Sequence, residues 1–72
     1  MEQARARELL ELAIANTQLS ARAFSAVLAV DERTIRRWLA GDRDVPGPVV
    51  QLCRLLISDP QLVLMLGTEE VA

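Results

Sequence analysis

The chain has 72 residues, of which 51% are hydrophobic, and its formal net charge at pH 7 is -2. This length supports one hydrophobic core rather than two, and the high hydrophobic content excludes a disordered chain. Histidine is absent and Cys53 is the one cysteine, which excludes an internal disulfide and a cysteine–histidine zinc site. The sequence therefore predicts a single domain over residues 1–72, with no metal and no cofactor.

Residues 2–16 and residues 20–28 have the apolar spacing that is typical of two amphipathic helices. The first segment is rich in strong helix formers. Ser20 is a suitable N-cap for the second, because its hydroxyl can accept a hydrogen bond from a free N–H group of the next turn. The expected apolar stripes are Ala6, Leu9, Leu10, Ala13 and Ile14 in the first helix, and Phe24, Val27 and Leu28 in the second.

A third, short helix is predicted between Asp31 and Gly41. The Asp31 carboxylate suits an N-cap, and Gly41 suits the left-handed conformation that often ends a helix. Only Ala29 and Val30 separate this helix from the one before it. The two helices are therefore expected to cross at a sharp angle.

The third helix has two chemically different sides. One side is apolar, and it consists of Ile35, Trp38 and Leu39. The other side consists of Arg33, Arg36 and Arg37. A helix that is held by its apolar side and presents arginine outward has the properties of a DNA-reading helix. Because Trp38 lies in the apolar stripe, we expect it to pack in the core rather than to stack on a base.

Turn-forming residues concentrate in residues 42–48, which are predicted to form a loop. Pro48 suits the first position of a fourth helix, which extends to about Ile57. Cys53 lies among the leucines of this helix and is interpreted as a small core residue rather than a reactive thiol. No segment alternates between apolar and polar residues, so the predicted fold class is all-α, a compact domain of five helices.

The fifth predicted helix is short and apolar on every side. Ser58 or Asp59 caps it, Pro60 opens it and Gly67 ends it. Its apolar surface exceeds what one face of a small domain can cover, so we expect it to pair two copies of the chain. The expected dimer surface is Leu62, Val63, Leu64, Met65 and Leu66. Residues 68–72 are expected to form a frayed tail.

The negative net charge hides a local concentration of positive charge. Residues 32–43 contain four arginines and two acidic residues, whereas residues 59–72 contain three acidic residues and no base. Averaged over the surface, the net charge argues against a general polyanion binder. The local concentration instead favours a binding face confined to one side of the domain.

A spaced pattern of residue types runs through the second and third predicted helices. It consists of Ser25, Ala29, Val30, Asp31, Thr34, Ile35, Trp38 and Gly41. This pattern resembles that of the Cro/repressor-type (XRE-like) helix-turn-helix family of phage and bacterial regulators. The proline-containing loop and helix that follow look like the C-terminal half of HigA-type antitoxins and of small anti-CRISPR-associated repressors. The resemblance covers roughly residues 19–62.

The resemblance implies which side chains contact DNA. In the family, residues at the start of the third helix and one turn later reach base edges, and these positions are Glu32, Arg33, Arg36 and Arg37. Arginine can donate two hydrogen bonds to guanine, and glutamate can accept one from cytosine. Glu32 and Arg36 are equally well spaced for a surface ion pair. The expected phosphate contacts are Arg22, Thr34 and Arg43, although Arg43 also fits a solvated loop charge.

Three residues depart from the family pattern. Ala29 stands where the family prefers glycine, which costs on the order of 1 kcal/mol if its φ is positive. Ala21 replaces a glutamine that contacts phosphate in many members, and this contact is then lost or moved to Arg22. Leu39 replaces a frequent glutamate and makes its face more apolar.

The resemblance implies a transcriptional repressor that binds double-stranded DNA as a homodimer on an inverted repeat. It also implies that the repressor acts at its own promoter. Two alternatives remain open: an antitoxin that binds DNA and also a toxin protein, and a protein-interaction module that uses residues 62–66. An enzyme is not expected, because no nucleophile and base can be paired. A secretory signal and a membrane-spanning run are also missing, so we expect a cytoplasmic protein that joins the nucleoid when bound to DNA.

Overall fold

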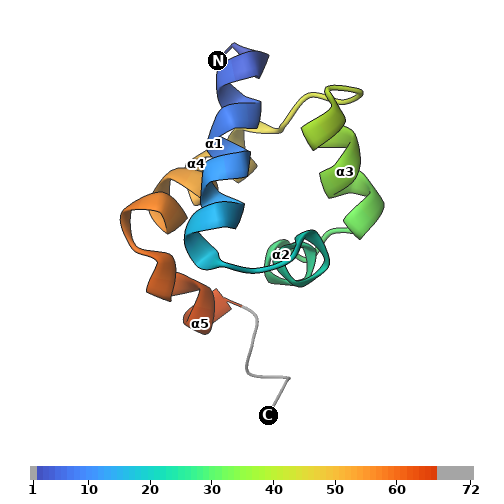
Figure 1. Cartoon of the computed structure of the whole chain (residues 1–72). Coiled ribbons are helices and arrows are strands. Elements are labelled where there is room, and N and C mark those ends of the chain that lie inside the picture. The colour runs from blue at the N-terminus through green and yellow to red at the C-terminus, as the bar shows by residue number, and fades with distance from the viewer. Residues whose placement is uncertain (1, 67–72) are drawn as a thin grey trace.

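Five α-helices and one 3-10 turn make up most of residues 2–66, the part of the chain that the computed structural model describes (Figure 1). Their bounds are Gln3–Thr17 (α1), Ala21–Leu28 (α2), Glu32–Ala40 (α3), Gly47–Ser58 (α4), Pro60–Leu62 (η1) and Val63–Leu66 (α5). No strand occurs in this range, which confirms the predicted compact all-α domain. Gly67 and the expected tail, residues 68–72, lie outside the described residues.

The helix ends follow the capping residues that the sequence predicted. The Ser20 hydroxyl accepts from the N–H of Ala23 at 3.1 Å, and the Asp31 carboxylate accepts from the N–H of Arg33 at 2.8 Å. Gly41 ends α3 with a φ of 83°. These local signals explain why the bounds of α2 and α3 match the prediction, and the observed bounds of α1 and α4 lie within one residue of the predicted ones.

The C-terminal helix differs from the prediction in its first turn. Of the two candidate caps it is Asp59 that binds, because its carboxylate accepts from the N–H of Gln61 at 3.2 Å. The segment then forms the 3-10 turn η1 before α5 begins at Val63. The missing N–H group of Pro60 costs nothing in this first turn, and the α-helix starts three residues later than predicted.

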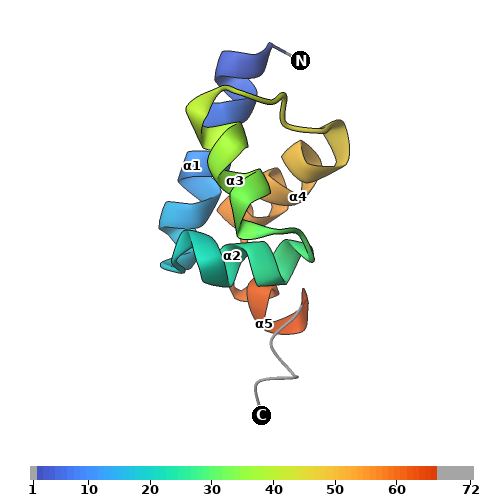
Figure 2. The ribbon, with the colours of Figure 1, turned by 90° about the vertical axis from the view of Figure 1, so that its right-hand side faces the viewer.

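The helices pack in two pairs around one core. α1 packs mainly against α4, and α2 packs against α3 and crosses near its N-terminal end (Figures 1 and 2). The largest fully buried side chains come from α1, α2, α3 and α4: Phe24, Leu10, Ile35, Leu56 and Cys53. Trp38 is 5% exposed, which confirms that it belongs to this core.

Two long-range hydrogen bonds fix α1 relative to both ends of α4. The amide of Asn16 donates to the carbonyl of Ile57 at 3.1 Å. The side-chain oxygen of Gln3 accepts from the backbone N–H of Val45 at 2.8 Å. The second bond holds the loop that joins α3 to α4, and with it the C-terminal end of α3.

Ala29, which stands where the sequence pattern prefers glycine, adopts the left-handed conformation with a φ of 59°. This conformation is strained for any residue with a Cβ atom. We expect Ala29→Gly to raise the free energy of unfolding by about 0.5–1 kcal/mol, since relief of strain outweighs the added entropy of glycine. Urea denaturation measures the change. The control is Ala26→Gly inside α2, where the same substitution should cost about 1 kcal/mol. A less stable Ala29→Gly variant would show that the left-handed conformation of Ala29 is not strained enough to outweigh the entropy of glycine.

Burial of Cys53 makes the domain sensitive to alkali. Burial without a charged partner raises the pKa of this thiol from 9.0 to about 11. The sequence contains no lysine, tyrosine or histidine, which are the other residue types whose ordinary side-chain pKa lies between about 6 and 12. As the pH rises from 9 to about 11, the unfolded chain loses the thiol proton while the folded chain keeps it.

The free energy of unfolding should therefore fall by about 2 kcal/mol over this pH range. Urea denaturation at a series of pH values measures the decline. In the Cys53→Ala variant, which starts from a lower stability, the curve should be flat over the same range. An equal decline in that variant would show that another group is responsible.

Candidate nucleic-acid interface

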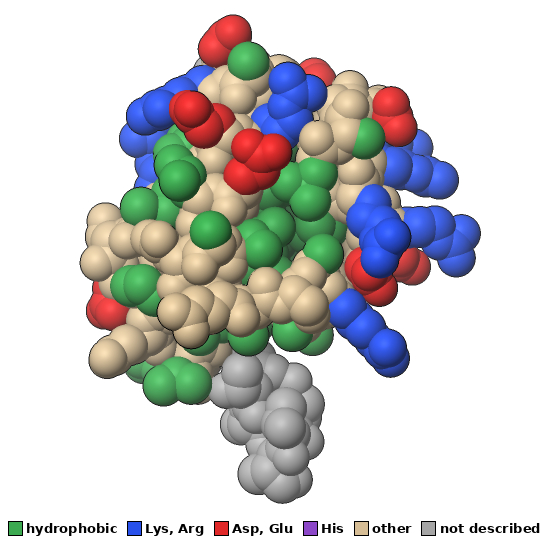
Figure 3. Space-filling model, in the orientation of Figure 1, with side chains coloured by type: hydrophobic (Ala, Val, Ile, Leu, Met, Phe, Trp, Pro, Cys, Tyr) green, Lys and Arg blue, Asp and Glu red, His purple; other side chains and the backbone are tan. Residues whose placement is uncertain are grey.

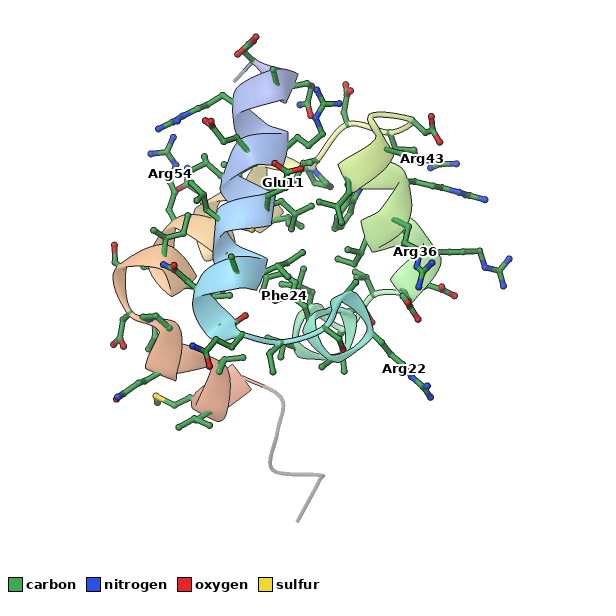
Figure 4. All side chains as sticks on the ribbon, viewed as in Figure 1. Glu11, Arg22, Phe24, Arg36, Arg43 and Arg54 are labelled. Carbon is green, nitrogen blue, oxygen red and sulfur yellow. The ribbon has the colours of Figure 1, made fainter. Side chains whose placement is uncertain are left out.

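The outer face of α3 is the most arginine-rich surface of the described chain. Ile35 and Trp38 fix the helix to the core, and its three arginines lie on the opposite, solvent-exposed side. Figure 4 shows Arg22, Arg36 and Arg43 extending away from the body of the domain on the same side, and Figure 3 shows basic side chains gathered there. We call this surface the arginine face; it consists of Arg22, Arg33, Arg36, Arg37 and Arg43.

The connection between α2 and α3 sets the position of the arginine face. Ala29 reverses the chain in the left-handed conformation, and the N–H of Val30 donates to the carbonyl of Ser25 at 3.0 Å. The buried Ser25 hydroxyl donates in turn to the carbonyl of Arg22 at 2.6 Å. The start of α2, which carries Arg22, is therefore tied through hydrogen bonds to the turn that begins α3.

The loop after α3 holds the other edge of the arginine face. The N–H groups of Asp42 and Arg43 donate to the carbonyl of Arg37, at 2.9 and 3.3 Å. A side chain at Gly41 would collide with the guanidinium of Arg7, which lies over this end of the helix. The backbone of Arg43 is therefore fixed to the last turn of α3, although its side chain is exposed.

Only two ion pairs occur among residues 2–66, and one of them lies on the arginine face. Arg36 pairs with Glu32 across one turn of α3, and Arg5 pairs with Glu8 on α1. Arg33 and Arg37 form no ion pair with any described residue. Two exposed guanidinium groups are thus available to an anionic or hydrogen-bond-accepting partner.

No protein-family model, curated protein or solved structure matches this chain.

Two further residues of α3, Thr34 and Glu32, were predicted to contact DNA. Thr34 is half-buried at the margin between the core side and the arginine face of α3. The Glu32 carboxylate is engaged by Arg36, so the ion pair that the spacing allowed is present.

Within residues 2–66, no cluster of acidic, cysteine or histidine side chains could hold a metal ion, and none of the helices is long and apolar enough to cross a bilayer.

The expected dimer surface is smaller than the sequence suggested. Val63 is 8% exposed and belongs to the core of its own domain, and Leu62 is partly buried against that core. Leu64 and Met65 are 67% and 78% exposed, whereas the side chain of Leu66 lies outside the described part. Two further apolar residues are exposed, Leu12 on α1 and Leu55 on α4. The apolar pattern of the fourth helix predicted a mostly buried Leu55, and that prediction was wrong.

Proposed function

We propose that the protein is a sequence-specific repressor that binds double-stranded DNA by placing the outer face of α3 in the major groove. The observation that carries this proposal is the exposure of three arginines on a short helix whose other side is anchored in the core. The major groove admits an α-helix, and arginine forms its commonest specific contact there, with guanine. The α2–turn–α3 unit then acts as a helix-turn-helix.

The flanks of the arginine face suit contacts with the DNA backbone. Arg22 lies near the start of α2 and Arg43 lies in the loop after α3, so they border the exposed side of the helix (Figure 4). A helix in the groove brings both flanks toward phosphates. We assign phosphate contacts to Arg22, Arg43 and Thr34, and base contacts to the arginines of α3.

The proposal is tested by selecting bound duplexes from a random pool. The protein should enrich one sequence, arranged as an inverted repeat, and its affinity for that sequence should fall steeply as the salt concentration rises. If no duplex is enriched at low salt, the proposal is wrong. Enrichment at the promoter of the protein's own gene would support autoregulation, which the family resemblance implies.

We further propose that two copies pair through α5. Leu64 and Met65 present exposed apolar side chains at the end of the molecule where α5 packs near α2 (Figure 1). A two-fold axis at this end would relate the two α3 helices in the way that an inverted repeat requires.

We expect Met65→Glu to convert a homodimer into a monomer, because the new charge would lie in an apolar contact. Light scattering measures the mass. Gln61→Glu is the control, because it adds the same charge at an exposed position of η1. A wild-type protein that is monomeric, or a Met65→Glu variant of unchanged mass, would exclude this dimer surface.

The exposed Leu64 and Met65 also favour a second candidate, a protein-interaction module or an antitoxin that holds a toxin on α5. This candidate predicts a stable complex with a second protein that Met65→Glu abolishes. An intact complex in that variant would exclude the second candidate.

A further inference from the structure

The ion pair on the arginine face has an asymmetric geometry. The Nε–H of Arg36 donates to Oε2 of Glu32 at 3.0 Å, and Nη2 donates to the same oxygen at 2.5 Å. Both bonds come from one edge of the guanidinium group, the edge formed by Nε and Nη2. Glu32 therefore binds the side edge of the guanidinium group and leaves the end edge, formed by Nη1 and Nη2, which we call the tip.

This arrangement leaves the tip of Arg36 available. A guanidinium group has five N–H donors, and Glu32 uses two of them. The two N–H bonds of Nη1 and one of Nη2 make no hydrogen bond with a described residue, and the Arg36 side chain is 70% exposed. The tip can still donate two parallel bonds to the O6 and N7 acceptors of guanine.

Glu32 is itself well placed to act as a fixed support. It is the first residue of α3, where the helix dipole favours a carboxylate, and its side chain is only 30% exposed. Arg33 and Arg37 have no such support among residues 2–66. Arg36 is thus the one arginine of α3 that a carboxylate of the described chain already biases toward one conformation.

We propose that Glu32 is a positioning residue, which holds the Nε–Nη2 edge of Arg36 so that the tip of Arg36 reads guanine. This inference rests on the proposed function, and it assigns Glu32 a role other than a direct contact with cytosine. Holding a long side chain in its bound conformation removes an ordering cost from binding. The support should therefore sharpen the preference at the base that Arg36 contacts.

The test compares duplexes selected by the wild-type protein with those selected by Glu32→Ala, Arg36→Ala and the double variant. Arg36→Ala should lower the preference for guanine at one operator position by about 5-fold or more. Glu32→Ala should lower the preference at that same position by about 2- to 10-fold, and the double variant should lose no more than Arg36→Ala alone. Glu32→Gln, which keeps a weaker acceptor, should lie between wild type and Glu32→Ala.

The matched control is Glu8→Ala, which removes the carboxylate of the Arg5–Glu8 pair on α1. It deletes the same charge from an exposed pair and should leave every operator position unchanged. Circular dichroism verifies that each variant folds. If Glu32→Ala relaxes a different base pair, or none, the positioning role is wrong. If the wild-type protein itself selects no sequence, it is the proposed function that fails.

Discussion

Replacing Trp38 with alanine is expected to lower the free energy of unfolding by about 3–5 kcal/mol. Trp38 is almost fully buried and joins α3 to the common core, so its removal loses a large apolar contact and leaves a cavity. A domain of 72 residues has a total stability of roughly 4–11 kcal/mol. The variant should therefore lose a large fraction of its stability at 25 °C.

Urea denaturation followed by far-UV circular dichroism measures this loss, since the variant has no tryptophan to report it. Arg37→Ala, the adjacent substitution on the exposed side of α3, is the control and should change the stability by at most about 0.5 kcal/mol. A Trp38→Ala variant that keeps wild-type stability but loses DNA affinity would contradict the core role. It would instead favour stacking of the indole on a base.

The combined substitution Arg33→Ala and Arg37→Ala should abolish sequence preference without unfolding the protein. Each arginine is exposed and lacks an ion pair within residues 2–66, so little stability depends on it. A bidentate contact between arginine and guanine discriminates by about 1–3 kcal/mol. Two such losses correspond to a factor of about 30 or more in the ratio of specific to random-sequence affinity.

Fluorescence anisotropy with the selected duplex and a scrambled duplex measures this ratio at constant salt. Arg54→Ala is the control, because Arg54 lies on the opposite side of the domain from Arg36 (Figure 4). It removes one charge of the same type but should leave the ratio unchanged. If the double variant keeps the wild-type ratio, α3 does not read the sequence.

The helices were predictable because the signals that bound them are local. Ser20, Asp31 and Gly41 act through hydrogen bonds or backbone angles within a few residues, so the sequence alone indicates where α2 and α3 begin and end. The same reasoning identified the two sides of α3, since helical spacing decides which side chains lie together. It could not distinguish Ser58 from Asp59 as a cap, because both residues suit that role.

Contacts between distant segments were not predictable in the same way. Nothing local indicates that Gln3 accepts a hydrogen bond from Val45, or that Val63 is covered by the core while Leu12 and Leu55 are exposed. Burial depends on where other helices lie, and apolar composition alone does not reveal it. For this reason the arginine face was predicted more completely than the apolar surface of α5.

The indole of Trp38 gives the molecule an internal optical probe. Tryptophan occurs once and tyrosine is absent, so the intrinsic emission comes almost entirely from the inner side of α3. Loss of the folded structure transfers the fluorophore to water and shifts its spectrum to longer wavelength. A molecule that binds the outer side of the same helix perturbs the indole emission while the indole remains buried. Occupancy and melting can therefore be distinguished in one unlabelled sample.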